Sequence, residues 1–123
     1  MDHSDGFLKV VEAAKKEIEE ITIEEYVSRQ EKGESFVLLD VREDKEWDKG
    51  HLPNATHLGK GIIERDIEKT IENKEEVIVL YCGGGFRSAL AAQSLKVMGY
   101  KKVFSLVGGF KEWEKKGREI IKD

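Results

Sequence analysis

Cys82 is the only cysteine in the chain, and it opens a segment whose residue types suit nucleophilic chemistry. Gly83, Gly84 and Gly85 follow it directly, then Phe86 and Arg87. Glycines let the backbone turn tightly with its amide groups directed inward. Successive amides in such a turn can bind an anion, and the thiolate is the nucleophilic form of cysteine. The spacing therefore predicts a reactive Cys82 held by a loop of backbone donors.

The residues on either side strengthen this prediction. Residues 77–81 form an apolar run typical of a buried strand, and residues 88–98 have the pattern of a helix. Cys82 would lie between them, where the helix N-terminus adds partial positive charge. Arg87 adds a permanent cation with a forked donor. A lone cysteine is more commonly a small buried apolar residue, but these features together favour a nucleophile.

The N-terminal part predicts two helices ahead of the first strand. Residues 1–6 are expected to be a loose tail. Apolar residues at spacings of four and three predict an amphipathic helix over 7–20, which either docks on the domain or binds a partner. Thr22 and Glu25 have the spacing of a capping box, so a second helix is expected over 23–31. We therefore expect a tail and helix over 1–20 and a single domain over 21–123.

Strands and helices alternate through the rest of the chain. Apolar runs predict strands at 36–39, 55–58, 77–81 and 103–106, and helical patterns predict helices around 46–47, over 63–73 and 88–98, and after 109. Strands that are apolar throughout are typical of a parallel sheet with helices on both faces. The predicted fold is a small doubly wound α/β domain. Ligands bind such sheets at the carboxyl ends of the strands, where Cys82, Asp40 and Arg42 would lie.

Composition excludes several classes of function. The chain has 123 residues, enough for one domain, and its net charge of −4 is spread over mixed acidic and basic residues. A nucleic-acid partner would need a basic stripe, and a zinc site of cysteines would need more than one thiol. The N-terminal 21 residues lack a long apolar run, so neither a signal peptide nor membrane binding is expected. A free thiol favours the cytoplasm, or the periplasm if a leader had been removed.

Several segments between Ile21 and Gly117 share their order and spacing with one protein family. They are residues 39–43 (LDVRE), 46–47 (EW), 50–55 (GHLPNA), 81–88 (YCGGGFRS), 98–100 (MGY), 108–110 (GGF) and Trp113. On these segments the chain resembles single-domain rhodaneses, which are sulfurtransferases with a small doubly wound α/β fold.

The resemblance implies that Cys82 takes a sulfane sulfur from a small anionic donor as a persulfide. It would pass the sulfur to cyanide, a thiol or a sulfur-accepting protein. Amides of residues 83 to 87 and the helix dipole would hold the persulfide without a metal or an organic cofactor. The expected substrate contacts are Gly83, Gly84, Gly85, Phe86, Arg87 and Arg42. Many thiosulfate-using members carry a basic residue directly after the cysteine. Glycine at 83 and 84 therefore favours a polysulfide, a persulfide or a protein donor.

Other residues near the predicted site have alternative roles. Asp40, Glu46 and His51 are expected to be structural. Arg42 either contacts substrate or pairs with Glu46 at helical spacing. His51 is either a base for Cys82 or a residue that fixes its turn through hydrogen bonds. Phe86 could point outward as an apolar lip for a substrate or partner.

Two other functions remain open alongside sulfur transfer. One is a non-catalytic sulfur carrier or docking domain, because an intact Cys82 fits a stoichiometric carrier as well as an enzyme. The other is a cysteine-based phosphatase or arsenate reductase. Those enzymes need five residues between cysteine and arginine, and this loop has four. A dithiol redox cycle would need a second, resolving cysteine.

Overall fold

A computed structural model describes residues 3–123 and contains one five-stranded parallel sheet in the order β1-β5-β4-β2-β3. The strands are β1 (Glu19–Ile21), β2 (Val37–Asp40), β3 (Ala55–His57), β4 (Val77–Tyr81) and β5 (Lys102–Leu106). The helices are α1 (Asp5–Lys15), α2 (Ile23–Glu31), α3 (Asp44–Asp48), the 3-10 helix η1 (Lys60–Ile62), α4 (Ile63–Thr70), α5 (Arg87–Val97) and α6 (Gly109–Lys115). The predicted α/β class is confirmed.

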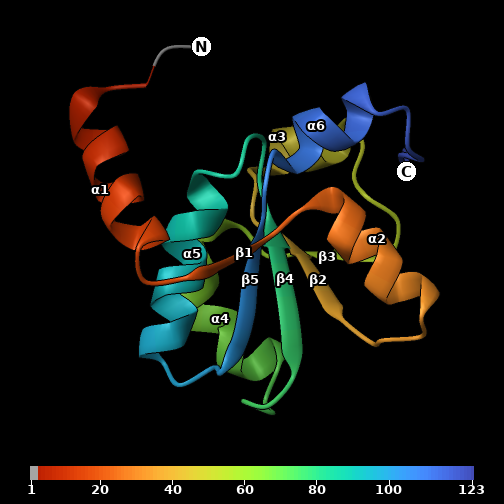
Figure 1. Cartoon of the computed structure of the whole chain (residues 1–123). Coiled ribbons are helices and arrows are strands. Elements are labelled where there is room, and N and C mark those ends of the chain that lie inside the picture. The colour runs from red at the N-terminus through yellow and green to blue at the C-terminus, as the bar shows by residue number, and fades with distance from the viewer. Residues whose placement is uncertain (1–2) are drawn as a thin grey trace.

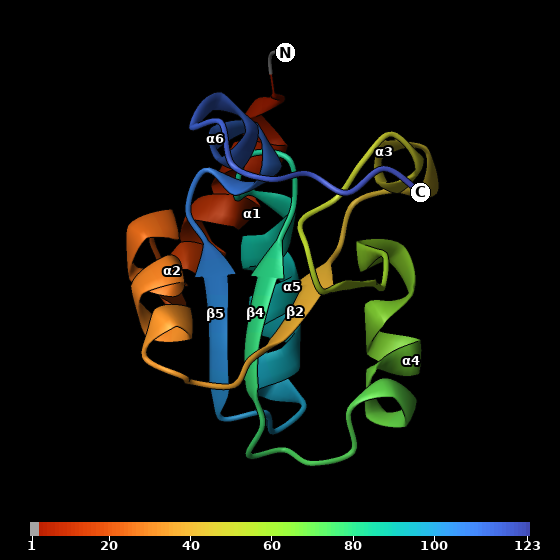
Figure 2. The same cartoon turned by 90° about the vertical axis from the view of Figure 1, so that its right-hand side faces the viewer.

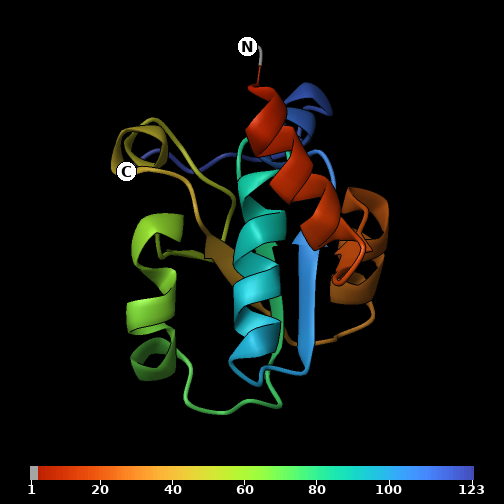
Figure 3. The same ribbon diagram turned by 90° about the vertical axis from the view of Figure 1, so that its left-hand side faces the viewer.

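Helices cover both faces of the sheet. On one face α5 packs against β4 and β5, with α1 and α4 on either side of it (Figures 1 and 3). Ile67 and Leu95 belong to the apolar core on that face. On the other face α2 and α6 bury Tyr26 and Trp113 against Val79. The central strand β4 is therefore buried on both sides, as its continuous apolar run predicted.

The N-terminal segment differs from the prediction. The helix expected over 7–20 spans Asp5–Lys15, and Ser4 caps it by accepting a hydrogen bond from the Phe7 amide. Residues 19–21 form the edge strand β1, which pairs with β5. Of the tail expected over 1–6, residues 5 and 6 are helical, and residues 1–2 lie outside the part that the structure describes. The strand was missed because only Ile21 of its three residues is buried, which leaves no apolar run.

The other elements follow the predicted order with small changes at their ends. The capping box at Thr22 is present, since its hydroxyl accepts from the Glu25 amide while the Glu25 carboxylate accepts from the Thr22 amide. The strands β2, β4 and β5 end at one edge of the sheet, below α6 and the β4–α5 loop (Figure 2). This edge is where the predicted site residues meet. Within residues 3–123, no helix has the length and apolar content needed to cross a bilayer.

Candidate active site

The Cys82 sulfur lies at the base of the β4–α5 loop. It accepts hydrogen bonds from the amides of Gly85, at 3.1 Å, and Ser88, at 3.3 Å. The residue is only 1% exposed, so its sulfur is shielded from solvent. Of the amides of residues 83–87 expected to act as donors, Gly85 contacts the sulfur, and Ser88 adds a donor from the first turn of α5. Two amide donors on one sulfur stabilise its anionic form.

The first turn of α6 holds the loop from the side. The Phe110 amide donates to the Cys82 carbonyl oxygen at 2.8 Å, and the Lys111 amide donates to the Gly83 carbonyl oxygen at 3.0 Å. Gly109 has a φ of +53°, and a Cβ there would overlap the Cys82 carbonyl oxygen. This position therefore requires glycine for two reasons, its backbone conformation and the close approach of the loop. The sequence showed the glycine pair at the start of α6 but not this contact.

Two buried hydroxyl groups lie beside the sulfur. The Ser88 oxygen is 3.5 Å from the Cys82 sulfur and 2.7 Å from the Ser105 oxygen of β5. Both serines are completely buried. Ser88 ends the segment 81–88, but neither serine was predicted to have a role. Their contact leaves no signal in the sequence because it depends on the packing of α5 against β5.

Arg87 is held by Glu46 rather than left free at the end of the loop. Its two terminal nitrogens donate to the two carboxylate oxygens at 2.7 and 3.0 Å. The hydrogen bonds from Arg87 lower the pKa of Glu46 from 4.5 to about 2, so the carboxylate is ionised at neutral pH. Glu46 was also a candidate partner for Arg42, and that pairing was wrong. The partner of Glu46 comes from the Cys82 loop, a contact that helical spacing cannot reveal.

Arg42 instead pairs with Asp40. One guanidinium nitrogen donates to the Asp40 carboxylate at 2.7 Å and to the Gly50 carbonyl oxygen at 2.6 Å, and the side chain is almost fully buried. The Tyr81 hydroxyl also donates to Asp40, at 2.5 Å. Burial, together with the Asp40 charge, raises the pKa of Tyr81. Asp40 is thus the centre of a buried polar network, and these contacts favour the structural alternative for Arg42.

His51 is engaged outside the Cys82 loop. Its Nε2 is 2.8 Å from a carboxylate oxygen of Asp123, its Nδ1 is 2.9 Å from the Leu52 carbonyl oxygen, and its ring stacks on Trp47. His51 and Ile121 also exchange backbone hydrogen bonds. These contacts favour the role of fixing the turn and leave no ring nitrogen directed at Cys82.

Phe86 packs against α1 instead of forming an open lip. The rings of His3 and Phe7 lie 4.8 and 6.3 Å from the Phe86 ring, and the Lys15 ammonium lies 5.0 Å from its centre. The amphipathic helix predicted at the N-terminus therefore docks on this chain and covers one side of the loop. Val11 and Ala14 are the residues that α1 buries.

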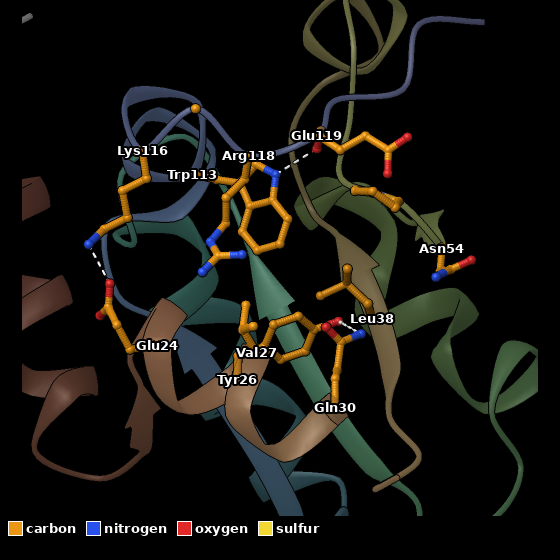
Figure 4. Close-up of a pocket in the computed structure, with 12 residues that line it drawn as sticks. Glu24, Tyr26, Val27, Gln30, Leu38, Asn54, Trp113, Lys116, Arg118 and Glu119 are labelled. Atoms are coloured by element: carbon orange, nitrogen blue, oxygen red, sulfur yellow. Dashed lines mark hydrogen bonds and ion pairs between the residues drawn. The ribbon is translucent and has the colours of Figure 1, made fainter. Parts of the chain in front are cut away.

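Two of the recesses on the described surface differ in their position relative to the loop. A cavity of about 870 Å³ is lined by Arg87, Arg42, Lys60 and Ile62 among others. Another, of about 690 Å³, lies between α2 and α6 over Tyr26 and contains no residue of the Cys82 loop (Figure 4). The first recess therefore reaches the Arg87 end of the loop. Among residues 3–123, no group of three or more His, Cys, Asp or Glu side chains is placed to hold a metal ion.

The fold and the site define a class of α/β protein in which a loop with one cysteine lies at the carboxyl edge of a parallel sheet. The model of the rhodanese-like domain matches residues 22–116, and the chain belongs to that family. The helix α1 lies outside the matched range.

Relatives with curated names include two that are linked to sulfur. A Bacillus subtilis protein provisionally named a sulfur carrier is 38% identical over 96 residues, which cover 78% of this chain and about half (51%) of that protein. A Coxiella burnetii thiosulfate sulfurtransferase is 36% identical over 83 residues, covering 68% of this chain and 76% of that protein.

A solved structure is similar over nearly the whole length of the chain. It is a Rhodopseudomonas palustris protein of unknown function for which tyrosine phosphatase activity has been suggested. The TM-score is 0.85 at 28% identity, and 98% of each chain is covered. The structural similarity thus extends beyond residues 22–116, which the family model matches, at both ends of the chain.

Proposed function

We propose that this protein is a sulfurtransferase that carries a sulfane sulfur as a persulfide on Cys82. One observation carries the proposal. The Cys82 sulfur accepts hydrogen bonds from two backbone amides, in a loop that has four residues between Cys82 and Arg87. The names of the Bacillus and Coxiella relatives support sulfur as the cargo.

The reaction requires two displacements at sulfur. The Cys82 thiolate attacks the outer sulfur of the donor, and a new S–S bond forms as the bond to the leaving group breaks. Thiosulfate would release sulfite, and an organic persulfide would release a thiolate. A thiol or cyanide then attacks the outer sulfur of the Cys82 persulfide, and Cys82 leaves as a thiolate. The chain thus needs only a stabilised thiolate and room for one further sulfur atom.

The charges around the loop favour a polysulfide, a persulfide or a protein donor over thiosulfate. Gly83 and Gly84 supply no cation, and the guanidinium of Arg87 is occupied by the Glu46 carboxylate. A thiosulfate dianion would find no free positive side chain within the loop itself. The Coxiella relative is named for thiosulfate, so the donor is a property to be tested on this chain.

A sulfur carrier without turnover is the second candidate, and the name of the Bacillus relative is what favours it. A phosphatase is less well supported. The loop has one residue fewer than phosphate binding needs, and Arg87 is paired with Glu46.

Steady-state turnover separates the enzyme from the carrier. Wild-type protein and Cys82→Ser would be mixed with polysulfide or thiosulfate as donor and cyanide as acceptor, and thiocyanate would be measured. We expect many turnovers per wild-type chain and none above background for Cys82→Ser. A single equivalent of thiocyanate per chain would support the carrier, and equal rates for both proteins would exclude a role for Cys82.

A further inference from the structure

Cys82, Ser88 and Ser105 form a short, buried hydrogen-bond network. Ser88 is in the first turn of α5 and Ser105 is in β5, so two elements of the fold bring them together. Their oxygens are 2.7 Å apart, and Ser88 is the one side-chain partner recorded for the Ser105 hydroxyl among the described residues. Burying a hydroxyl without a partner is costly, so each serine depends on the other.

Which group donates in this network depends on the charge on the Cys82 sulfur. A thiolate has no proton, so the Ser88 hydroxyl can only donate to it across the 3.5 Å contact. The Ser88 oxygen is then free to accept from Ser105. With a neutral thiol, the sulfur can donate to Ser88 and Ser88 to Ser105. The pair thus supplies a donor to the sulfur when the sulfur is charged.

We propose that Ser105 is a positioning residue that turns the Ser88 hydroxyl toward the Cys82 sulfur and thereby favours the thiolate. Donation from Ser105 polarises the Ser88 hydroxyl and strengthens its bond to sulfur. Without Ser105, no group on β5 holds the Ser88 hydroxyl in this direction, and the hydroxyl can rotate away from the sulfur. The inference rests on the proposed function only in taking Cys82 as the reactive thiol.

The serine pair also interacts differently with the two forms of Cys82, the thiolate (the empty state) and the persulfide (the loaded state). In a persulfide the negative charge lies on the outer sulfur, one bond beyond the sulfur that Ser88 contacts. The hydroxyl donor therefore stabilises the empty thiolate more than the loaded form. The charged groups near the loop are Arg87 with its partner Glu46, Lys15 beside the Phe86 ring, and the buried Asp40–Arg42 pair at the end of β2. None of them bonds to either serine hydroxyl.

The test is a thiolate titration followed by ultraviolet absorbance, with Cys82→Ser as the blank. Because the chain has one cysteine, the difference signal reports Cys82 alone. We expect Ser105→Ala to raise the titration midpoint by about half a pH unit, which is about threefold in the thiolate fraction. We expect Ser88→Ala to raise it at least as far. The double variant should match Ser88→Ala, because Ser105 acts through Ser88. Ser94→Ala is the matched control, since that hydroxyl on α5 bonds to Glu64.

Ser105→Thr and Ser105→Val match each other in shape, so the comparison between them isolates the hydroxyl whatever the effect of alanine on folding. Threonine should keep the wild-type midpoint, and valine should reproduce the alanine shift. Equal midpoints for threonine and valine, or additive shifts in the double variant, would overturn the proposal. The titration needs no sulfur donor. A failure of sulfur transfer would therefore overturn the proposed function and leave this result standing.

Discussion

Two glycines of the site tolerate a side chain very differently. Gly109 has a positive φ and contacts the Cys82 carbonyl group, whereas a Cβ on Gly84 would meet nothing within 4 Å. We expect Gly109→Ala to lower the free energy of unfolding by about 2 kcal/mol, because strain and a backbone clash add. Gly84→Ala should stay within about 0.5 kcal/mol of wild type. Urea unfolding measures both, and equal losses would contradict the close approach of α6 to the loop.

Gly84 is also the position where a cation can be added without disturbing the fold. It is exposed and its backbone needs no positive φ. Gly84→Arg should raise kcat/KM for thiosulfate by about tenfold at low salt, because a positive side chain attracts the dianion. Activity with a neutral organic polysulfide should change little.

Gly84→Gln is the control, since it adds length without charge. An equal gain for both donors, or the same gain with glutamine, would show that charge at position 84 does not select the donor.

The residues of the site were predictable to the extent that they are neighbours in sequence. Cys82, the glycines and Arg87 form one segment with a recognisable spacing. The roles of Gly109, Ser105 and Glu46 depend on contacts with segments far away in the chain. The sequence separation between Glu46 and Arg87 also explains why Arg42, which is nearby in sequence, was considered as the partner of Glu46.

At the scale of elements, α1 lies outside the residues that the family model matches and contacts the Cys82 loop through Phe86. We expect Phe7→Ala to lower the free energy of unfolding by about 1 kcal/mol through the lost aromatic contact. Hydrogen exchange of the loop amides should become faster because Phe86 loses its cover. Leu8→Ala, on the exposed side of the same helix, should change neither quantity. Unchanged exchange in Phe7→Ala would mean that α1 does not support the loop.

The order and type of most elements could be predicted because the central strands are continuous apolar runs. Buried strands such as Val77–Tyr81 and the capping box at Thr22 carry their signal locally. The edge strand β1 does not, because it buries one residue and owes its conformation to pairing with β5. The predicted helix was extended through Glu19 and Glu20 for this reason.

At the scale of the whole molecule, the Glu46–Arg87 pair joins α3 to the Cys82 loop and makes stability depend on pH. The pKa of Glu46 is about 2 in the folded protein and ordinarily 4.5. The pair therefore stabilises the fold fully above about pH 4.5, and this contribution is lost as the pH falls toward about 2. Both side chains are about one-third exposed, so the contribution should be only about 1 kcal/mol.

Urea unfolding of Glu46→Gln at several pH values measures the contribution of the ion pair to the free energy of unfolding. The variant should be less stable than wild type at pH 7 and equal to it near pH 2. Asp48→Asn, at the exposed last residue of the same helix, is the control. A difference between Glu46→Gln and wild type that does not change with pH would contradict the ion pair.

The central claim is that Cys82 accepts a sulfur atom, and intact mass measures this most directly. Wild-type protein and Cys82→Ser would be incubated with polysulfide, and separately with thiosulfate, then weighed before and after cyanide. We expect wild type to gain one sulfur with polysulfide and to lose it to cyanide, with a smaller gain from thiosulfate. Cys82→Ser should gain none. No gain by wild type with either donor, or an equal gain by Cys82→Ser, would contradict a Cys82 persulfide.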